Sequence, residues 1–462
     1  MAEVRNQPVK PALPSGVRDF GPQEVARRRY VFDTLRRVFE RYGYQPLETP
    51  VMELLSTLEG KYGEEGDRLL FRILNSGDAF AVWKEKYGDH LIGQFGFPLR
   101  DIAEKGLRYD LTVPFARYVV MNRHRLAFPF RRYQIQPVFR ADRPQKGRYR
   151  EFYQCDADVI GSNSLLLEAE LIKIYDDAFS ELGLNVTIRI NSRKVLLGLA
   201  QCCGAEQQFY AMTVVLDKLD RIGLDGVEQE LGRLGWNAEQ RQMLRALFHV
   251  EGSNEERVQK AGALLTQTAG EEGCRELQQT LHWLNVLGAP HQAVEVDFSL
   301  ARGLNYYTGI IYEVVSRDGT LKSSLGGGGR YDDLTGVFGL PGISGVGISF
   351  GADRIYDVMA ELNLFPATSE SHTRLLFCCM DQASMYWAAP LLSDLRRRGL
   401  PAEMYPEPEK LQKQLRYAHS RGIPYAALVG EQERYTNRLT VKDLRSGQQQ
   451  SVAPHELYEK II

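Results

Sequence analysis

The sequence has no stretch of roughly 20 consecutive apolar residues, the length that an α-helix needs to cross a bilayer. Its N-terminal segment up to Pro14 is polar and rich in proline, so it lacks the apolar centre of a secretory signal peptide. The six cysteines include two adjacent pairs and no CxxC spacing, which indicates neither a zinc site nor a disulfide framework. These absences predict a cytoplasmic protein with free thiols and no membrane segment.

An excess of one sign of charge is also missing, since 57 Lys and Arg residues stand against 59 Asp and Glu residues. This balance argues against a nonspecific nucleic-acid coat protein, so any contact with nucleic acid must come from a local basic patch. One such patch exists. Residues 123–150 contain nine Lys or Arg residues and a single acid, Asp142.

The common signatures of nucleotide loops and hydrolase triads are missing as well. The glycine run 326–329 fits neither GxxxxGK[ST] nor GxGxxG, and close strand packing or a mobile loop explains it equally well. The histidines are scattered, and no Ser/His/Asp arrangement is visible. Any chemistry must therefore come from another set of polar residues.

What the sequence does have is a β-hairpin over residues 133–161 with one polar face. Its arms alternate with period two, and a basic loop with Pro144 and Gly147 as turn formers joins them. Charges on a face that packs inward are costly unless they are paired or used. The ordinary alternative is an exposed hairpin with solvated arginines. The residues predicted to share the polar face are Gln136, Val138, Arg140 and Asp142 on the first arm, and Phe152, Gln154, Asp156 and Asp158 on the second.

Three further places put polar residues where strand patterns predict burial. Within residues 107–117 a short strand leads Asp110 and Thr112 into a helix. Within residues 343–355 a glycine-containing strand leads into a helix with Arg354 in its first turn. Arg302 precedes Tyr306 and Tyr307 in a loop, where a simple salt bridge is the common role of such an arginine. Together, arginines, amides and carboxylates suit a ligand that carries both phosphates and an ammonium group.

Four of these stretches resemble a known family. Residues 139–154, FRADRPQKGRYREFYQ, resemble motif 2 of class II aminoacyl-tRNA synthetases in the histidyl form. Residues 300–309, LARGLNYYTG, resemble the histidine-specific motif of histidyl-tRNA synthetases. Residues 347–354 are similar to motif 3, and the helix and strand of residues 22–50 are similar to motif 1, through which these enzymes dimerise.

The resemblance implies an α+β fold, in which an antiparallel-sheet catalytic core carries a helical insertion and a C-terminal α/β anticodon-binding domain. It also implies a homodimer that joins L-histidine to tRNA(His), with ATP as a substrate accompanied by Mg²⁺ and no metal site built by the protein itself. The expected segments are the core in residues 1–191 and 290–361, the insertion in 192–289, and the anticodon-binding domain in 374–462 after a linker over 362–373.

The resemblance further implies roles for single residues. Arg140 and Arg302 would be catalytic and, with Glu151 and Arg354, would bind ATP. The basic loop would meet the acceptor end of the tRNA. Histidine would be bound by Asp110, Leu111, Thr112, Gln154, Asp158, Tyr306, Tyr307 and Tyr331, and the acceptor end of the tRNA by Gln145, Lys146 and Arg148.

Two departures from the family pattern stand out. Asn305 takes the place of an aspartate in the histidine-specific motif, and the stretch from Tyr109 to Thr112 replaces the Glu-Gly-Thr of many bacterial members. The alternative to an enzyme is an inactive relative, either the regulatory paralogue of an ATP phosphoribosyltransferase or a tRNA sensor. The C-terminal domain and the arginine and tyrosine residues of the site favour the enzyme.

Overall fold

A computed structural model describes residues 10–78, 81, 84–85, 102–145, 147–301, 306–319, 324–366 and 373–462. The chain divides into two compact units, one formed by residues 10–19 and 31–364 and the other by residues 20–30 and 365–462. Among the described residues, no helix has the length and apolar character needed to span a membrane.

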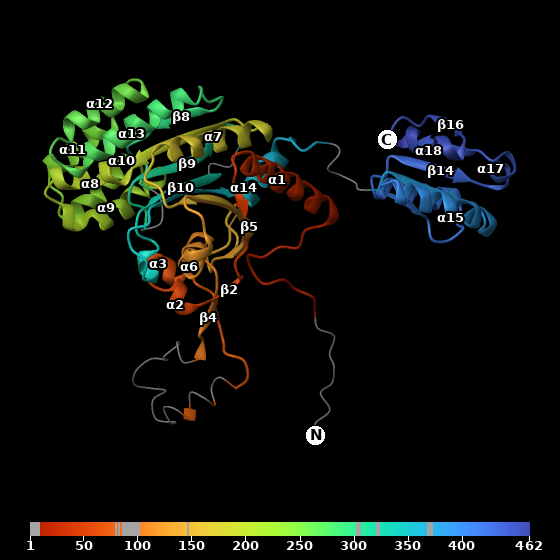
Figure 1. Ribbon diagram of the computed structural model, residues 1–462, viewed down its shortest axis with the longest axis horizontal. Coiled ribbons are helices and arrows are strands. Elements are labelled where there is room, and N and C mark those ends of the chain that lie inside the picture. The colour runs from red at the N-terminus through yellow and green to blue at the C-terminus, as the bar shows by residue number, and fades with distance from the viewer. Residues whose placement is uncertain are drawn as a thin grey trace. The chain divides into compact units, whose positions relative to one another are not determined.

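An eight-stranded sheet forms the centre of the first unit (Figure 1). Its neighbouring strands run antiparallel except at the two edges, where β1 is parallel to β5 and β8 is parallel to β7. This confirms the predicted antiparallel core. In spatial order the strands are β1 Gln45–Pro46, β5 Phe130–Phe139, β6 Glu151–Ile160, β11 Gly345–Gly351, β10 Gly326–Tyr331, β9 Ile310–Ser316, β7 Val186–Ser192 and β8 Ala293–Val296.

Helix α7, Leu166–Glu181, lies along one face of this sheet, as Figure 1 shows. Tyr175 of α7 donates its hydroxyl hydrogen bonds to the backbone oxygens of Gly327 on β10 and Ser349 on β11. Phe350 of β11 contacts the ring of Tyr175 and also that of Phe39, which belongs to α1, Pro22–Arg41. This face is therefore covered by helices, which contact it through aromatic rings.

The apolar stripe of α1 is used inside the protomer. From residue 31 onward, the helix buries Val31, Leu35, Val38 and Phe39, each at most 1% exposed. The helical spacing of these apolar residues can be seen in the sequence, and by itself it fits either a core stripe or an oligomer surface. The structure places these side chains in the core, so they do not form a surface for a second subunit.

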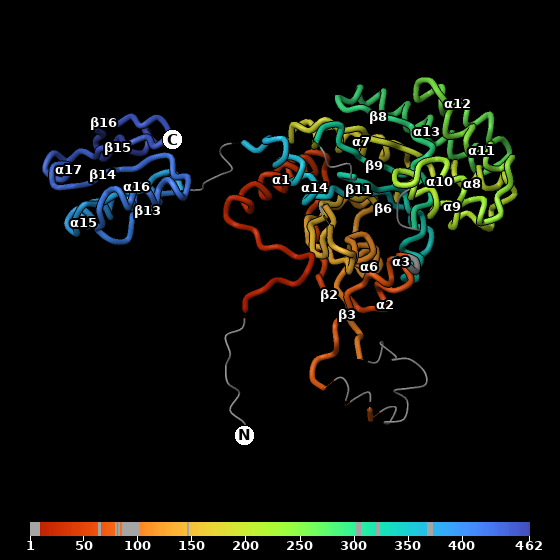
Figure 2. The backbone as a smooth tube through the Cα atoms, turned by 180° about the vertical axis from the view of Figure 1, so that it is seen from behind, coloured from red at the N-terminus to blue at the C-terminus, as the bar shows by residue number. Residues whose placement is uncertain are grey.

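The expected helical segment consists of helices that gather on one side of the sheet, in green in Figures 1 and 2. Its treatment as a domain of its own remains a prediction. Its helices are α8 Arg193–Cys202, α9 Phe209–Leu216, α10 Leu219–Arg233, α11 Ala238–Phe248, α12 Asn254–Leu264 and α13 Ala269–Val286.

Short elements complete the first unit near the site. Strands β2 Met52–Leu54, β4 Lys105–Leu107 and β3 Arg72–Ile73 form a small sheet. The short strand that the sequence predicts before Asp110 is β4, and it ends at Leu107. The helices are α2 Leu55–Leu58, α3 Gly63–Arg68, α6 Thr112–Asn122 and α14 Ala352–Glu361.

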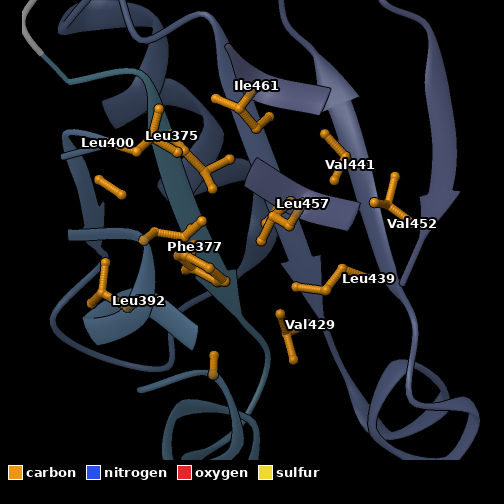
Figure 3. Close-up of a cluster of buried hydrophobic side chains, with 14 of the residues drawn as sticks. Leu375, Phe377, Leu392, Leu400, Val429, Leu439, Val441, Val452, Leu457 and Ile461 are labelled. Atoms are coloured by element: carbon orange, nitrogen blue, oxygen red, sulfur yellow. The ribbon is translucent and has the colours of Figure 1, made fainter. Parts of the chain in front are cut away.

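The second unit contains a five-stranded sheet with its own apolar core, formed by side chains such as Phe377, Val429 and Leu457 (Figure 3). The βαβαβ rhythm of the sequence from residue 375 onward predicts a parallel sheet, and this is wrong for the second half of the sheet, since β15 runs antiparallel to β14 and β16 runs antiparallel to β15. A parallel crossover needs about a dozen residues or more, and the connection from β14 to β15 is shorter. The elements are β12 Leu375–Cys379, α15 Gln382–Arg397, β13 Ala402–Met404, α16 Leu411–Ser420, β14 Tyr425–Val429, α17 Glu431–Thr436, β15 Leu439–Asp443, β16 Gln449–Val452 and α18 Leu457–Ile461.

Candidate functional site

The second face of the large sheet, opposite α7, collects the polar side chains and is called the site face below. Because side chains alternate along a strand, the even-numbered residues of β6 point to this face and the odd-numbered ones pack toward α7. Gln136 lies opposite Gln154, and Val138 lies opposite Phe152, so the prediction that these four residues share one face of a hairpin is confirmed. Arg140 and Asp142 differ, since β5 ends at Phe139.

Glycines on β10 and β11 make room for the residues of the site face. A Cβ at Gly347 would overlap the carboxylate of Asp158, and one at Gly345 would overlap the ring of Tyr331. A Cβ at Gly329 would lie 2.8 Å from Cδ1 of Tyr307. The glycine run is thus a strand with close packing, and no phosphate loop.

Asp158 lies between a buried cation and a buried phenol. Its Oδ2 is 2.8 Å from a guanidinium nitrogen of Arg132, and its Oδ1 accepts a hydrogen bond of 2.7 Å from the hydroxyl of Tyr331. Burial raises the pKa of the Asp158 carboxyl, and the positive charge of Arg132 opposes that shift. The side chain of Arg132 is 0% exposed.

Asp156 lies two residues before Asp158 on the same face and is also buried. Burial raises its pKa to about 7, Arg132 opposes the shift, and the neighbouring Asp158 carboxylate adds to it. Two carboxylates therefore share one arginine in a region from which water is largely excluded.

Asp110 is the centre of a second buried group. Its Oδ1 accepts hydrogen bonds from the hydroxyl of Tyr62, at 2.9 Å, and from the backbone N–H of Val113 in the first turn of α6. Its Oδ2 accepts a hydrogen bond of 3.3 Å from the hydroxyl of Tyr306. Burial raises the pKa of this carboxyl as well, and these donors oppose the shift.

Aromatic rings connect the two acidic groups. The rings of Tyr306 and Tyr331 meet edge to face with centroids 6.0 Å apart, and Tyr307 packs on Tyr306 in the same way at 4.8 Å. A continuous path thus runs from Asp110 through Tyr306 and Tyr331 to Asp158. The structure brings these predicted residues together, although they come from four separate stretches of sequence.

Gln154 lies on the same face as Asp158. Its Nε2 donates a hydrogen bond of 2.8 Å to Oγ of Ser349 on β11. Its Oε1 is buried and accepts no hydrogen bond from the residues that the structure describes. Such an oxygen is costly to bury alone and is available to a ligand donor. Leu111 and Thr112, at the start of α6, are buried.

Arg140 follows β5 and is held in one orientation. Its guanidinium stacks 4.2 Å from the ring centroid of Tyr109, and its Nε donates a hydrogen bond of 3.2 Å to the backbone oxygen of that residue. Phe152 contributes a second ring at 5.2 Å. A fixed guanidinium of this kind suits phosphate binding. Glu151, at the start of β6, is exposed.

Arg354 lies in the first turn of α14 and links two loops. Its Nε donates to the backbone oxygen of Gly147, at 2.9 Å, and its Nη1 to that of Ser324, at 2.8 Å.

Gln145 and Arg148 form the bridge that closes the basic loop, and both are exposed. Arg148 pairs with Asp142 at 2.7 Å, which explains why Asp142 does not join the site face.

Two predicted site residues, Arg302 and Lys146, lie outside the described residues, as does Asn305. Other residues of the site were not predicted from the sequence. Arg132 belongs to the same hairpin face as Gln136, and alternation extended through Gln134 toward the N-terminus would have included it. Tyr62 and Ser349 reach the site only through the fold, and no local pattern indicates them.

The sequence matches the family described as "Histidyl-tRNA synthetase" over residues 16–85 and 101–355, and the "Anticodon binding domain" over residues 376–462. The chain belongs to the histidyl-tRNA synthetase family. Two relatives named "Histidine--tRNA ligase" agree along almost the whole chain. That of Phocaeicola vulgatus is 51% identical over 450 residues, 97% of this chain and 98% of its own. That of Porphyromonas gingivalis is 52% identical over 443 residues, 96% of both chains.

A solved structure of histidyl-tRNA synthetase from Nostoc sp. has a TM-score of 0.81 at 31% identity and covers 98% of this chain and 99% of its own. A Bacillus halodurans protein described as an ATP phosphoribosyltransferase regulatory subunit/histidyl-tRNA synthetase shares the fold, with a TM-score of 0.70 at 20% identity. It covers 89% of this chain and 97% of its own. The near full-length identity to ligases confirms the prediction of a synthetase over the regulatory alternative.

Proposed function

We propose that the chain activates L-histidine with ATP, releasing pyrophosphate, and then transfers histidine from the adenylate to the 3′ end of tRNA(His). The observation that supports this most directly is the path of side chains from Asp110 to Asp158. It provides two separate buried carboxylates, as a ligand with a cationic amino group and a polar ring would require.

In this proposal, Asp110, Thr112 and Gln154 bind the amino group of histidine. The unpartnered Oε1 of Gln154 and the carboxylate of Asp110 are both acceptors, which an ammonium group needs. Leu111 lines this part of the site.

Asp158 accepts a hydrogen bond from one imidazole nitrogen, and Tyr307 bonds the other. Tyr306 and Tyr331 line the ring site. An apolar analogue of the same size would leave the buried carboxylate without its partner, so it would be rejected strongly.

Arg140 binds the α-phosphate of ATP, and Arg354 binds its γ-phosphate end. The carboxylate of histidine attacks the α-phosphorus while pyrophosphate leaves, so a preoriented cation such as Arg140 lowers the barrier as negative charge shifts. From the family resemblance, Arg302 acts beside Arg140, and Glu151 contacts the adenosine.

Within the described residues, no group of three or more His, Cys, Asp or Glu side chains is placed to hold a metal ion. The oxygen ligands that Mg²⁺ prefers are present on the phosphates of ATP. We therefore infer that Mg²⁺ enters bound to ATP, where it neutralises phosphate charge.

The exposed Gln145 and Arg148, together with Lys146, contact the acceptor end of tRNA(His), and the second unit contacts the anticodon. Phosphate contacts by lysine and arginine should be sensitive to salt.

A cytoplasmic homodimer is also part of the proposal. Met52 and Leu54 of β2, which are 49% and 54% exposed, are available for contact with a second subunit, whereas the apolar stripe of α1 is not.

The test is ATP–pyrophosphate exchange with each of the twenty amino acids in turn. Exchange should require histidine, and subsequent addition of tRNA(His) should give charged tRNA. Exchange with another amino acid, or none with histidine, would contradict the proposal. Sedimentation at micromolar concentration tests the dimer separately, since an active monomer would exclude it.

A further inference from the structure

Arg132 is a buried arginine that has no role in the proposed reaction as described above. It lies on β5 directly opposite Asp158 on β6, with a guanidinium nitrogen 2.8 Å from Oδ2 of that residue. The ring of Phe115 lies 4.4 Å from the guanidinium carbon and holds the plane of the group. Both the pairing and the stacking aim this charge at the site face.

Arg108, by contrast, is a buried arginine with a structural role. Arg108 is also fully buried, but it donates hydrogen bonds of 2.7 Å to the backbone oxygens of Pro137 and Thr49 and so ties three segments together. Arg132 has one long backbone contact, 3.5 Å to the oxygen of Leu111. Its Nε and Nη1 have no hydrogen-bond partner among the described residues. Arg132 thus contributes little to connecting the chain.

Arg132 supplies a positive charge next to a group of buried acids and phenols. Two buried carboxylates, Asp156 and Asp158, face it, and burial raises the pKa of both. In each case Arg132 opposes the shift. The charged and titratable groups around Asp158 are Arg132 from β5, Asp156 from β6, Tyr331 from β10, Tyr307 from the segment before β9, and Tyr44 from the segment before β1.

We propose that Arg132 is a positioning residue of the histidine site, which keeps Asp158 fixed as the carboxylate that accepts the imidazole N–H. The inference rests on the proposed function. The Tyr331 hydroxyl holds one oxygen of the carboxylate by a hydrogen bond, and the charge of Arg132 attracts the other. That second oxygen, Oδ2, accepts no hydrogen bond from the described residues, so it can accept one from the imidazole. A protonated Asp158 would present an O–H donor where the imidazole needs an acceptor.

The experiment is histidine-dependent ATP–pyrophosphate exchange by the full chain between pH 6 and pH 9, with wild type and Arg132→Met. Loss of an opposite charge within about 4–6 Å raises a carboxyl pKa by about 1–3 units. We expect KM for histidine to rise about tenfold or more at pH 7 and the excess to shrink as the pH increases, because Asp158 then ionises. KM for ATP should remain within about twofold of the wild-type value, since Arg132 lies on the amino-acid side.

Arg131→Met is the matched control. Arg131 is the preceding residue on the same strand, but it points to the opposite face and pairs with Glu170 of α7, with one contact of 2.9 Å. Its loss removes a charge of the same sign without touching Asp158. The histidine pH profile of this variant should coincide with that of wild type.

Two further measurements separate positioning from a general loss of stability. In an Asp158→Asn background, Arg132→Met should change KM for histidine much less than it does in wild type, because the group through which Arg132 acts is already altered. Arg132→Lys keeps the charge, so its pH profile should follow wild type. The same change of KM in both backgrounds, or the same pH shift in Arg132→Lys as in Arg132→Met, would overturn the inference.

If Arg132→Met does not fold, the double variant Arg132→Met/Asp156→Asn removes one charge of each sign and is compared with Asp156→Asn alone, because the two carboxylates raise each other's pKa. The double variant should show the pH shift relative to Asp156→Asn, and coinciding profiles of the two would also overturn the inference. The proposed function fails on a different result, namely the absence of histidine-dependent exchange in the wild-type chain.

Discussion

Gly347 on β11 lies directly opposite Asp158 on β6, and the Asp158 carboxylate occupies the space that a side chain at Gly347 would fill. The acid is therefore enclosed by backbone on one side, by Arg132 on another and by Tyr331 on a third. A carboxylate in such surroundings has a fixed position.

Gly347→Ala should displace Asp158 and weaken histidine binding. Overpacking of a well-packed interior typically costs about 1–3 kcal/mol of stability, and here the atom that must move belongs to the site. We expect a lower thermal midpoint and a higher KM for histidine, measured by calorimetry and pyrophosphate exchange. Gly351→Ala, on the same strand, is the control, because the nearest atom to its Cβ would be the backbone oxygen of Leu325, at 3.4 Å. Equal behaviour of the two variants would contradict the prediction.

Asp156→Asn should change how stability depends on pH. The pKa of Asp156 is about 7 in the folded chain, against a reference value of 3.8, so folding takes up a proton between about pH 4 and pH 7. Its contribution to wild-type stability therefore falls as the pH rises through this window. Removing the acid removes that loss, and the unfolding midpoint of the variant relative to wild type should increase from pH 5 to pH 7 and then level off.

The control for this titration is Asp19→Asn, which removes an exposed acid far from the buried pair in sequence. Urea unfolding at pH 5, 6, 7 and 8 for the three proteins gives the comparison. A constant difference between Asp156→Asn and wild type over this range would show that Asp156 does not carry the proton.

Asp158→Asn keeps the shape of the side chain but removes its charge and turns one oxygen into a donor. The imidazole partner then meets a weaker acceptor or a clashing donor. We expect histidine binding to weaken by about 1.5–3 kcal/mol, the value of a hydrogen bond to a charged group, measured as KM for histidine. A change in KM for ATP instead would place Asp158 in the nucleotide site. The control is Glu170→Gln in α7, which covers the opposite face of the sheet. This variant should leave KM for histidine unchanged.

A chain that ends at residue 364 should still activate histidine but charge tRNA poorly. Every described residue of the histidine and ATP sites precedes this point, and the second unit has an apolar core of its own. The measurements are pyrophosphate exchange and the initial rate of charging at limiting tRNA(His), after sedimentation has established the size of the shortened protein. Normal charging would contradict an anticodon role for the second unit.

The sequence was sufficient to predict the hairpin and its polar face. Period-two alternation is a local property, because the peptide geometry sends successive side chains to opposite sides of a strand. Gln154 and Asp158 were found in this way, and the structure places Gln136 on the same face, directly opposite Gln154. The same rule failed for Asp142, because the strand ends at Phe139 and alternation does not continue through a loop.

Only the tertiary structure decided which of these polar residues meet. Arg132 reaches Asp158 through the strand register, Tyr62 reaches Asp110 across 48 positions of sequence, and Gly347 makes room for Asp158 from a different stretch of the chain. Likewise, the apolar stripe of α1 was visible in the sequence, but its burial in the protomer was not. Periodicity states which side chains share a face of one element. What that face contacts depends on packing between segments far apart in the sequence. A local pattern does not show which segments these are.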